Sequence, residues 1–165
     1  MTEYQRLFLV QARSSFDVYQ LLRKTPGIHA CHVLHYFQMA TELLGKAHSW
    51  KNDPPNVTSH RSFVGFIRSL SSNRKAQQLM ELEGLNASWN QMIRKSVPFA
   101  QEVETLAPQL AKDGPNPEYP WPPANPQTAP VEHTFEIWET LTGTVTGRKF
   151  LDMVGKLFAS AEEFL

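Results

Sequence analysis

The chain has 165 residues, a length that suits a single domain, residues 1–165, with a sizeable core. Its hydrophobic content of 41% is typical of a globular protein and excludes intrinsic disorder across the chain. The net charge is zero, but residues 1–95 carry 12 basic and 6 acidic side chains, whereas residues 96–165 carry 4 and 10. Such asymmetry fits a side that faces nucleic acid, or helices that attract one another within the fold or across a dimer. We favour the second interpretation because the basic excess is not concentrated in one patch.

One cysteine, Cys31, excludes an internal disulfide framework and fits a reducing cytosol. No activating motif surrounds it, so we expect an inert thiol. The N-terminal residues lack the apolar run and the cleavage pattern of a signal peptide, and no segment approaches the roughly 20 apolar residues that span a bilayer. The sequence therefore predicts a cytoplasmic protein with no membrane partner.

Residues 4–24 form the first predicted helical region, and a pair of serines divides its apolar residues. Ser14 and Ser15 can cap a helix, and Asp17 follows where the helix dipole favours an acid. We expect one helix with a break near Arg13, or two short helices.

Residues 29–50 are predicted to form an uninterrupted helix at the centre of the fold. Pro26-Gly27 forces a turn before it, and Asn52-Asp53-Pro54-Pro55 forbids helix after it. At about 100° per residue, apolar side chains form a stripe along one face. The stripe consists of Val33, Leu34, Phe37, Ala40, Thr41, Leu44 and Ala47. Glu42 and Lys46 lie one turn apart on the far side, where we expect an exposed ion pair that contributes only about 0.3–0.5 kcal/mol.

Histidines are dense in this helix, and two imidazoles at positions i and i+3 can share a metal ion. His29, His32 and His35 are each three residues apart, so they drift around the helix and do not converge. No HExxH motif and no second helix with acidic ligands accompanies them. We therefore expect no metal site and no cofactor.

The next helix is expected to begin after Thr58 or Ser59, either of which can cap it. Its apolar residues at helical spacing are Phe63, Phe66, Ile67 and Leu70. Residues 71–73 interrupt this pattern and can cap a further short helix. His60 and Arg61 stand at the start of the most basic segment of the chain. Basic side chains and helix N-termini bind phosphate, although a solvated face is the commoner role of exposed arginine.

Residues 86–110 show the clearest helical periodicity, with Asn86 as a candidate cap and apolar residues at steps of three and four. These residues are Trp89, Met92, Ile93, Val97, Ala100, Val103, Leu106 and Leu110. An aromatic and methionine stripe at this spacing is more often core than cofactor site, so we expect a buried helix.

Residues 112–130 hold seven of the twelve prolines, which excludes a regular helix there. Tyr119 and Trp121 favour an ordered loop that packs on the bundle or lines a pocket, because disordered linkers are poor in aromatic residues.

Residues 131–142 fit either an extended segment or a short helix. Apolar residues from Phe150 onward mark an amphipathic terminal helix.

Two segments resemble a known family. The early helix has the pattern HxLHYxQMATExLxKA, which stands here as residues 32–47, and His60 follows a proline-rich turn. This order of parts resembles the HEPN-like helical bundles, in which a QxAxExxxKA helix precedes a loop and a helix that starts near a histidine. Residues 116–121, NPEYPW, resemble the family's RYP-type loop before the last helix. The resemblance spans about residues 10–125 and implies an antiparallel up-and-down bundle, often dimeric, with roles in RNA cleavage or nucleotide-related binding.

The resemblance does not extend to the motif on which the family's ribonucleases rely, an arginine followed four to six residues later by a histidine on a late helix. No histidine follows Arg94 or Arg148 at that spacing, and Glu118 stands where the RYP pattern has an arginine. Only Arg23 and His29 have the literal spacing, and a Pro-Gly turn separates them. The resemblance therefore implies a member without the usual catalytic pair.

Three functional hypotheses follow, within an all-α, antiparallel up-and-down bundle of four to five main helices with a long proline-rich loop before the C-terminal helix. The first is a non-catalytic binding or assembly module that self-associates, with a nucleotide, RNA or protein as a further partner. The second is a HEPN-type ribonuclease, since histidine performs acid–base chemistry near neutral pH. The third is a small-ligand or metal site between facing helices. The candidate catalytic residues are His35, Glu42, His60 and Arg61, and the candidate ligand-binding residues are His32, Lys46, Tyr119 and Trp121.

Overall fold

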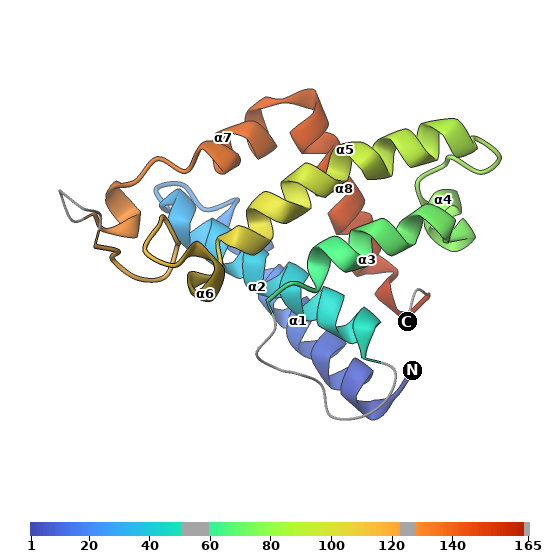
Figure 1. Cartoon of the computed structure of the whole chain (residues 1–165), viewed down its shortest axis with the longest axis horizontal. Helices are drawn as coiled ribbons and strands as arrows, with labels where there is room; N and C mark the ends of the chain where they lie inside the picture. The colour runs from blue at the N-terminus through green and yellow to red at the C-terminus, as the bar shows by residue number, and fades with distance from the viewer. Residues whose placement is uncertain (51–59, 123–127, 164–165) are drawn as a thin grey trace.

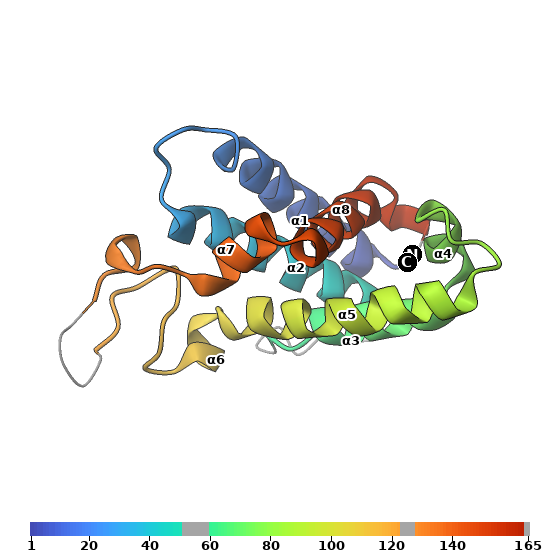
Figure 2. The same cartoon turned by 90° about the horizontal axis from the view of Figure 1, so that it is seen from above.

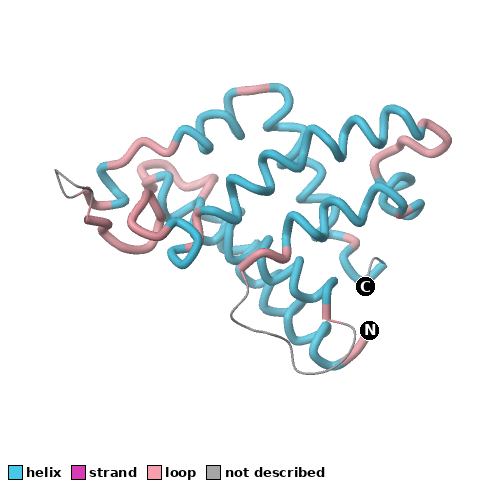
Figure 3. Tube along the Cα trace, in the orientation of Figure 1, coloured by secondary structure: helices cyan, strands magenta, loops and turns pink. Residues whose placement is uncertain are grey.

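A computed structural model describes residues 1–50, 60–122 and 128–163 of the chain. Within these ranges 73% of the residues are helical, in eight α-helices and three short 3₁₀ segments, and there is no strand (Figures 1 and 3). The predicted all-α class is therefore confirmed for the described part of the chain.

Helices α1 (Glu3–Leu22) and α2 (Ala30–Ser49) form an antiparallel pair. Helix α1 begins with a capping box, in which Thr2 and Gln5 each accept a hydrogen bond from the other's backbone N–H. The break predicted near Arg13 is wrong, because α1 runs without interruption. Ser15 is buried on the inner face of the helix and caps nothing, so packing against the core prevails over the local capping preference of serine.

Helix α2 is the central element, and it contacts α1, α3 and α5 (Figure 2). All seven residues of its predicted apolar stripe are buried, as the helical period predicts. Cys31 lies near its start and is 1% exposed, and burial raises the pKa of the thiol. The expectation of an inert thiol accords with this placement, because the raised pKa leaves little reactive thiolate.

The basic segment folds into α3 (Phe63–Ser69), a 3₁₀ turn (Leu70–Ser72) and α4 (Arg74–Leu79). The predicted interruption is confirmed, and Asn73 caps α4 by accepting from the backbone N–H of Ala76. The predicted caps Thr58 and Ser59 lie outside the described residues.

Helix α5 (Asn86–Thr105) continues through Pro98 and runs beside α3 in the opposite direction (Figures 1 and 2). The N-cap residue of α5 is Leu85, and not Asn86 as expected. The Asn86 side chain instead accepts a hydrogen bond from Gln77, 3.1 Å away, which ties the start of α5 to α4.

The chain then forms α6 (Pro108–Ala111), the proline-rich loop, a 3₁₀ turn (Pro130–Glu132), α7 (Glu136–Gly143), α8 (Val145–Ala159) and a last 3₁₀ turn (Ala161–Glu163). Of the two alternatives for residues 131–142, the helix is the one that forms, from Glu136 onward.

The buried hydrophobic residues make one connected core, in which Phe16 of α1 stacks on Phe158 of α8 with ring centroids 4.0 Å apart. No described helix combines the length and the apolar character needed to cross a membrane.

Candidate functional site

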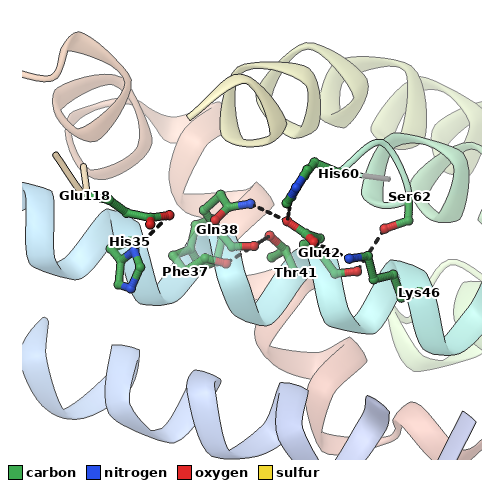
Figure 4. Close-up of polar contacts among 9 residues, drawn as sticks. All are labelled: His35, Phe37, Gln38, Thr41, Glu42, Lys46, His60, Ser62 and Glu118. Atoms are coloured by element: carbon green, nitrogen blue, oxygen red, sulfur yellow. Dashed lines mark hydrogen bonds and ion pairs between the residues drawn. The ribbon is translucent and has the colours of Figure 1, made fainter. Parts of the chain in front are cut away.

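The polar residues of α2 gather around one buried carboxylate, that of Glu42 (Figure 4). Its Oε1 lies 2.5 Å from Lys46 Nζ, one turn along the helix. Its Oε2 accepts from Gln38 Nε2 at 2.8 Å and lies 2.8 Å from His60 Nδ1. Both oxygens of Glu42 are thus engaged by charged or polar partners, as a buried carboxylate requires.

The predicted exposed pair of Glu42 and Lys46 is wrong, because these residues are only 8% and 5% exposed. The segment that contains His60 and Ser62 covers this side of α2, and Lys46 also lies over the ring of Trp50, 5.8 Å from its centroid. Helical spacing identifies the side of a helix on which a residue lies, but not whether another segment covers it. The pair is therefore a buried interaction, and it is far more sensitive to loss of one partner than a surface pair.

Gly45 allows α3 to begin directly against α2. A Cβ atom at this position would lie 2.5 Å from the carbonyl carbon of Ser62, closer than real Cβ contacts. Ser62 Oγ donates to the Glu42 carbonyl oxygen at 2.9 Å and closes the same joint. We refer to Glu42, Gly45, Lys46, His60 and Ser62 as the α2–α3 joint.

Glu104 of α5 supports the first turn of α3. Its Oε1 accepts from the backbone N–H of Val64 at 2.9 Å, at a helix start whose own N-cap residue, Ser62, makes no side-chain cap. Burial raises the pKa of the Glu104 carboxyl, the neighbouring charge of Glu42 adds to that effect, and the backbone N–H groups of α3 oppose it.

The outer side of the joint forms the floor of a pocket of 360 Å³ between α2, α6 and the proline-rich loop. Its polar lining comprises His35, Gln38, Glu42, His60, Gln109, Glu118 and Tyr119. Met39, Leu43 and Pro108 supply an apolar wall. None of the described residues that line it is an arginine or a lysine, so the pocket offers carboxylates, imidazoles and amides but no permanent cation.

A turn at Asn116 builds the rim of this pocket. The buried Asn116 side chain accepts from the backbone N–H groups of Glu118 and Tyr119, at 3.0 and 2.9 Å, as in an Asx turn. The Glu118 carboxylate is thereby held 3.5 Å from His35 Nδ1, which is an ion-pair distance for a protonated imidazole but too long for a good hydrogen bond. No other described residue makes an ion pair with Glu118.

The structure brings together His35, Glu42 and His60 of the predicted catalytic set, and Tyr119 of the predicted ligand-binding set. Tyr119 is 60% exposed and stands at the rim. Lys46 lies behind Glu42, away from the pocket.

Besides Lys46, three of the predicted site residues lie outside the pocket. Arg61 lines a separate hollow between α3 and α5, which it shares with Glu104. His32 is exposed and does not line the pocket. Trp121 is buried and packs edge-on against the rings of His133 and Phe135, so the proline-rich loop is anchored as expected by one of its two aromatic residues.

Sequence reasoning missed Gln38, Glu104 and Glu118 as functional or supporting residues. Gln38 lies one helical turn before Glu42, and that spacing was a usable signal. Glu118 and Glu104 reach the site from distant segments, so no local pattern reveals them. Among the described residues there is no group of three His, Cys, Asp or Glu side chains arranged to hold a metal ion.

Comparison of the chain with protein-family models, with curated proteins and with solved structures finds no match.

Proposed function

We propose that the chain is a non-catalytic binding module, built as a HEPN-like up-and-down bundle of four to five main helices, whose pocket binds a small positively charged ligand. The observation that carries this proposal is the partly buried Glu118 carboxylate, which faces the pocket with an imidazole as its ion-pair partner. The single cysteine and the absence of a disulfide framework support a cytoplasmic protein.

The charges around the pocket favour a cation as its ligand. Glu42 is neutralised by Lys46, but among the described residues Glu118 is balanced only when His35 is protonated. A desolvated carboxylate gains from an opposite charge within about 4–6 Å, so an ammonium or guanidinium group of a ligand would bind favourably beside Glu118. The exposed ring of Tyr119 offers the same group a cation–π contact at the rim.

The size of the pocket favours a small ligand. Its volume of 360 Å³ lies at the lower end of the range of about 300–1,000 Å³ that is usual for small-molecule sites. A phosphate group, by contrast, has no lysine or arginine to pair with in the described lining, which disfavours the nucleotide alternative at this pocket.

A second candidate function is a ribonuclease, and the contact between Glu42 and His60 favours it. When the His60 proton resides on Nδ1, it is donated to the carboxylate, and Nε2 is left as a basic lone pair. A carboxylate-supported imidazole is an established form of general base. Degradation of labelled single-stranded RNA, lost in His60→Ala, would support this function over the first.

The test of the binding proposal is an NMR titration of the isotope-labelled protein with agmatine, which carries an amine and a guanidinium group, and with AMP as an anionic probe. We expect agmatine to shift the amide signals of Gln38, Glu118 and Tyr119, and AMP to leave them in place.

Glu118→Gln should weaken agmatine binding by about 10-fold or more, the typical loss of a charge-assisted hydrogen bond. Glu102→Gln is the matched control, because it removes the same charge from an exposed position on α5. Equal weakening by both variants, or a preference for AMP, would refute the proposal.

A further inference from the structure

The outward face of α1 carries an unusual concentration of exposed apolar side chains. Ten large hydrophobic residues of the described chain are exposed, and five of them fall within residues 1–21, at 49–65% exposure. They are Met1, Tyr4, Leu7, Val10 and Leu21. Single exposed apolar residues are ordinary, but a group of them on one helix indicates a binding surface.

Three of these residues, Leu7, Val10 and Leu21, share one side of the helix. Leu7, Ser14 and Leu21 recur every seven residues, or about two turns, so they line up along the centre of the exposed face. Val10 and the half-buried Val18 flank this line. We refer to Leu7, Val10, Ser14, Val18 and Leu21 as the α1 stripe.

The opposite side of α1 is buried against the rest of the chain. Ala12 and Tyr19 are buried there, and Phe16 stacks on Phe158 of α8. Helix α1 lies at the edge of the described fold (Figures 1 and 2). The α1 stripe is on the side of the helix away from its buried residues. Among the described residues, Leu7, Val10, Ser14 and Leu21 of the stripe remain exposed.

We infer that the partner is a second copy of this chain, whose own α1 packs antiparallel against the first. A two-fold axis beside Ser14 would set Leu7 of each copy opposite Leu21 of the other, because each leucine lies seven residues from Ser14. The small side chain of Ser14 at the crossing point lets the helix axes approach closely. The stripe is thus complementary to itself under the symmetry that is commonest in homodimers.

The charges at the ends of α1 select the antiparallel direction. Glu3 lies at the start of the helix, and Lys24 follows its end, and both are exposed. In the antiparallel arrangement Glu3 of one copy and Lys24 of the other come to the same level on the same side of the pair. A parallel arrangement would instead place like charges together, which disfavours it. Glu3 already pairs with Arg6 of its own chain, at a solvent-exposed position where such pairs exchange at little cost.

The dimer should be reversible, because one helix from each copy is a smaller contact than the roughly 1,600 Å² of a standard interface. The ligand pocket is formed by α2, α6 and the proline-rich loop, so this inference stands independently of the proposed ligand.

Sedimentation equilibrium of the full chain over a wide concentration range tests the inference. We expect the wild type to dimerise, and Leu7→Lys/Leu21→Lys to shift the dissociation constant at least 100-fold toward monomer. Val131→Lys is the control, since it places a lysine at an exposed apolar position outside α1, and it should leave the association unchanged. Far-UV circular dichroism checks that each variant is folded.

A cross-linking experiment tests the antiparallel arrangement separately. In a Cys31→Ala background, Ser14→Cys should form a disulfide-linked dimer on oxidation, because the two-fold axis brings the two positions within disulfide reach. Glu139→Cys, at an exposed position on α7, should not. A wild-type chain that stays monomeric, or a dimer that Leu7→Lys/Leu21→Lys does not weaken, would overturn the inferred surface. A dimer that is weakened but not cross-linked through position 14 would overturn the antiparallel arrangement.

Discussion

Two carboxylate–imidazole pairs face the same pocket, and they differ in how completely they are satisfied. Glu42 contacts Lys46, Gln38 and His60 within 2.8 Å, on a helix in the centre of the fold. Glu118 stands on a loop, and its one ion-pair partner among the described residues is His35, at 3.5 Å. A carboxylate with both oxygens engaged contributes mainly to stability, whereas one with spare acceptor capacity is available to a ligand. The floor of the pocket is therefore expected to be structural and the rim functional.

The largest effect should come from removing the floor carboxylate. Glu42→Ala removes the buried carboxylate that Lys46, Gln38 and His60 all contact, which should lower the free energy of unfolding by about 3–5 kcal/mol in urea denaturation. Glu118→Ala, at the rim, should lower it by less than about 1 kcal/mol. Equal losses from the two variants would abolish the distinction between floor and rim.

Gly45→Ala tests the α2–α3 joint by steric means alone. The added methyl group would collide with the backbone at Ser62, so we expect a loss of about 1–3 kcal/mol in the same measurement. Gly155→Ala is the control, because a Cβ there meets nothing within 4 Å, and in helix α8 it should stabilise by up to about 1 kcal/mol. A stabilising Gly45→Ala would contradict the close approach of the two helices.

Asn116→Ala should loosen the rim while the floor stays intact. It removes the acceptor for two backbone N–H groups, so we expect a loss of about 1 kcal/mol and faster hydrogen exchange at Glu118 and Tyr119. The exchange of α2 amides should not change. Asn116→Asp keeps the acceptor oxygen and should preserve protection at the rim.

The smallest effect is a pH dependence at Glu104. Its folded pKa is raised above the ordinary 4.5, so the folded state holds this proton more tightly than the unfolded state does. The contribution of this carboxyl to stability is therefore complete below pH 4.5 and is lost as the pH rises through the raised pKa. Relative to Glu104→Gln, the wild type should lose stability over that interval in thermal melts recorded at successive pH values. If the wild type instead became more stable relative to Glu104→Gln as the pH rises, the pKa of Glu104 would be lowered in the folded state.

The sequence predicted what depends on local pattern. The apolar stripe of α2 and the interruption at residues 71–73 follow from helical period and from residues that end helices, and both are confirmed. What failed depends on which segments meet. The break near Arg13 was expected because serine favours caps, but core packing carries α1 through Ser15. The pair between Glu42 and Lys46 was expected to be exposed because the covering segment at His60 lies outside α2, and the helical period of α2 gives no information about it.

The rim could be predicted only in part. Tyr119 was a candidate because it is an aromatic residue in a proline-rich stretch, but its neighbour Glu118 reaches the pocket through the turn at Asn116. The fold that brings residues 116–119 opposite His35 is not encoded in either segment alone. This is why the pair between Glu118 and His35 became visible only in three dimensions.

The burial of Cys31 makes its thiol a natural probe of how often the core opens. Because this thiol is the only one in the chain and lies in the core near the start of α2, an alkylating reagent can reach it only after the surrounding helices part. The rate of alkylation under native conditions therefore reports how often the centre of the molecule opens, without an introduced label.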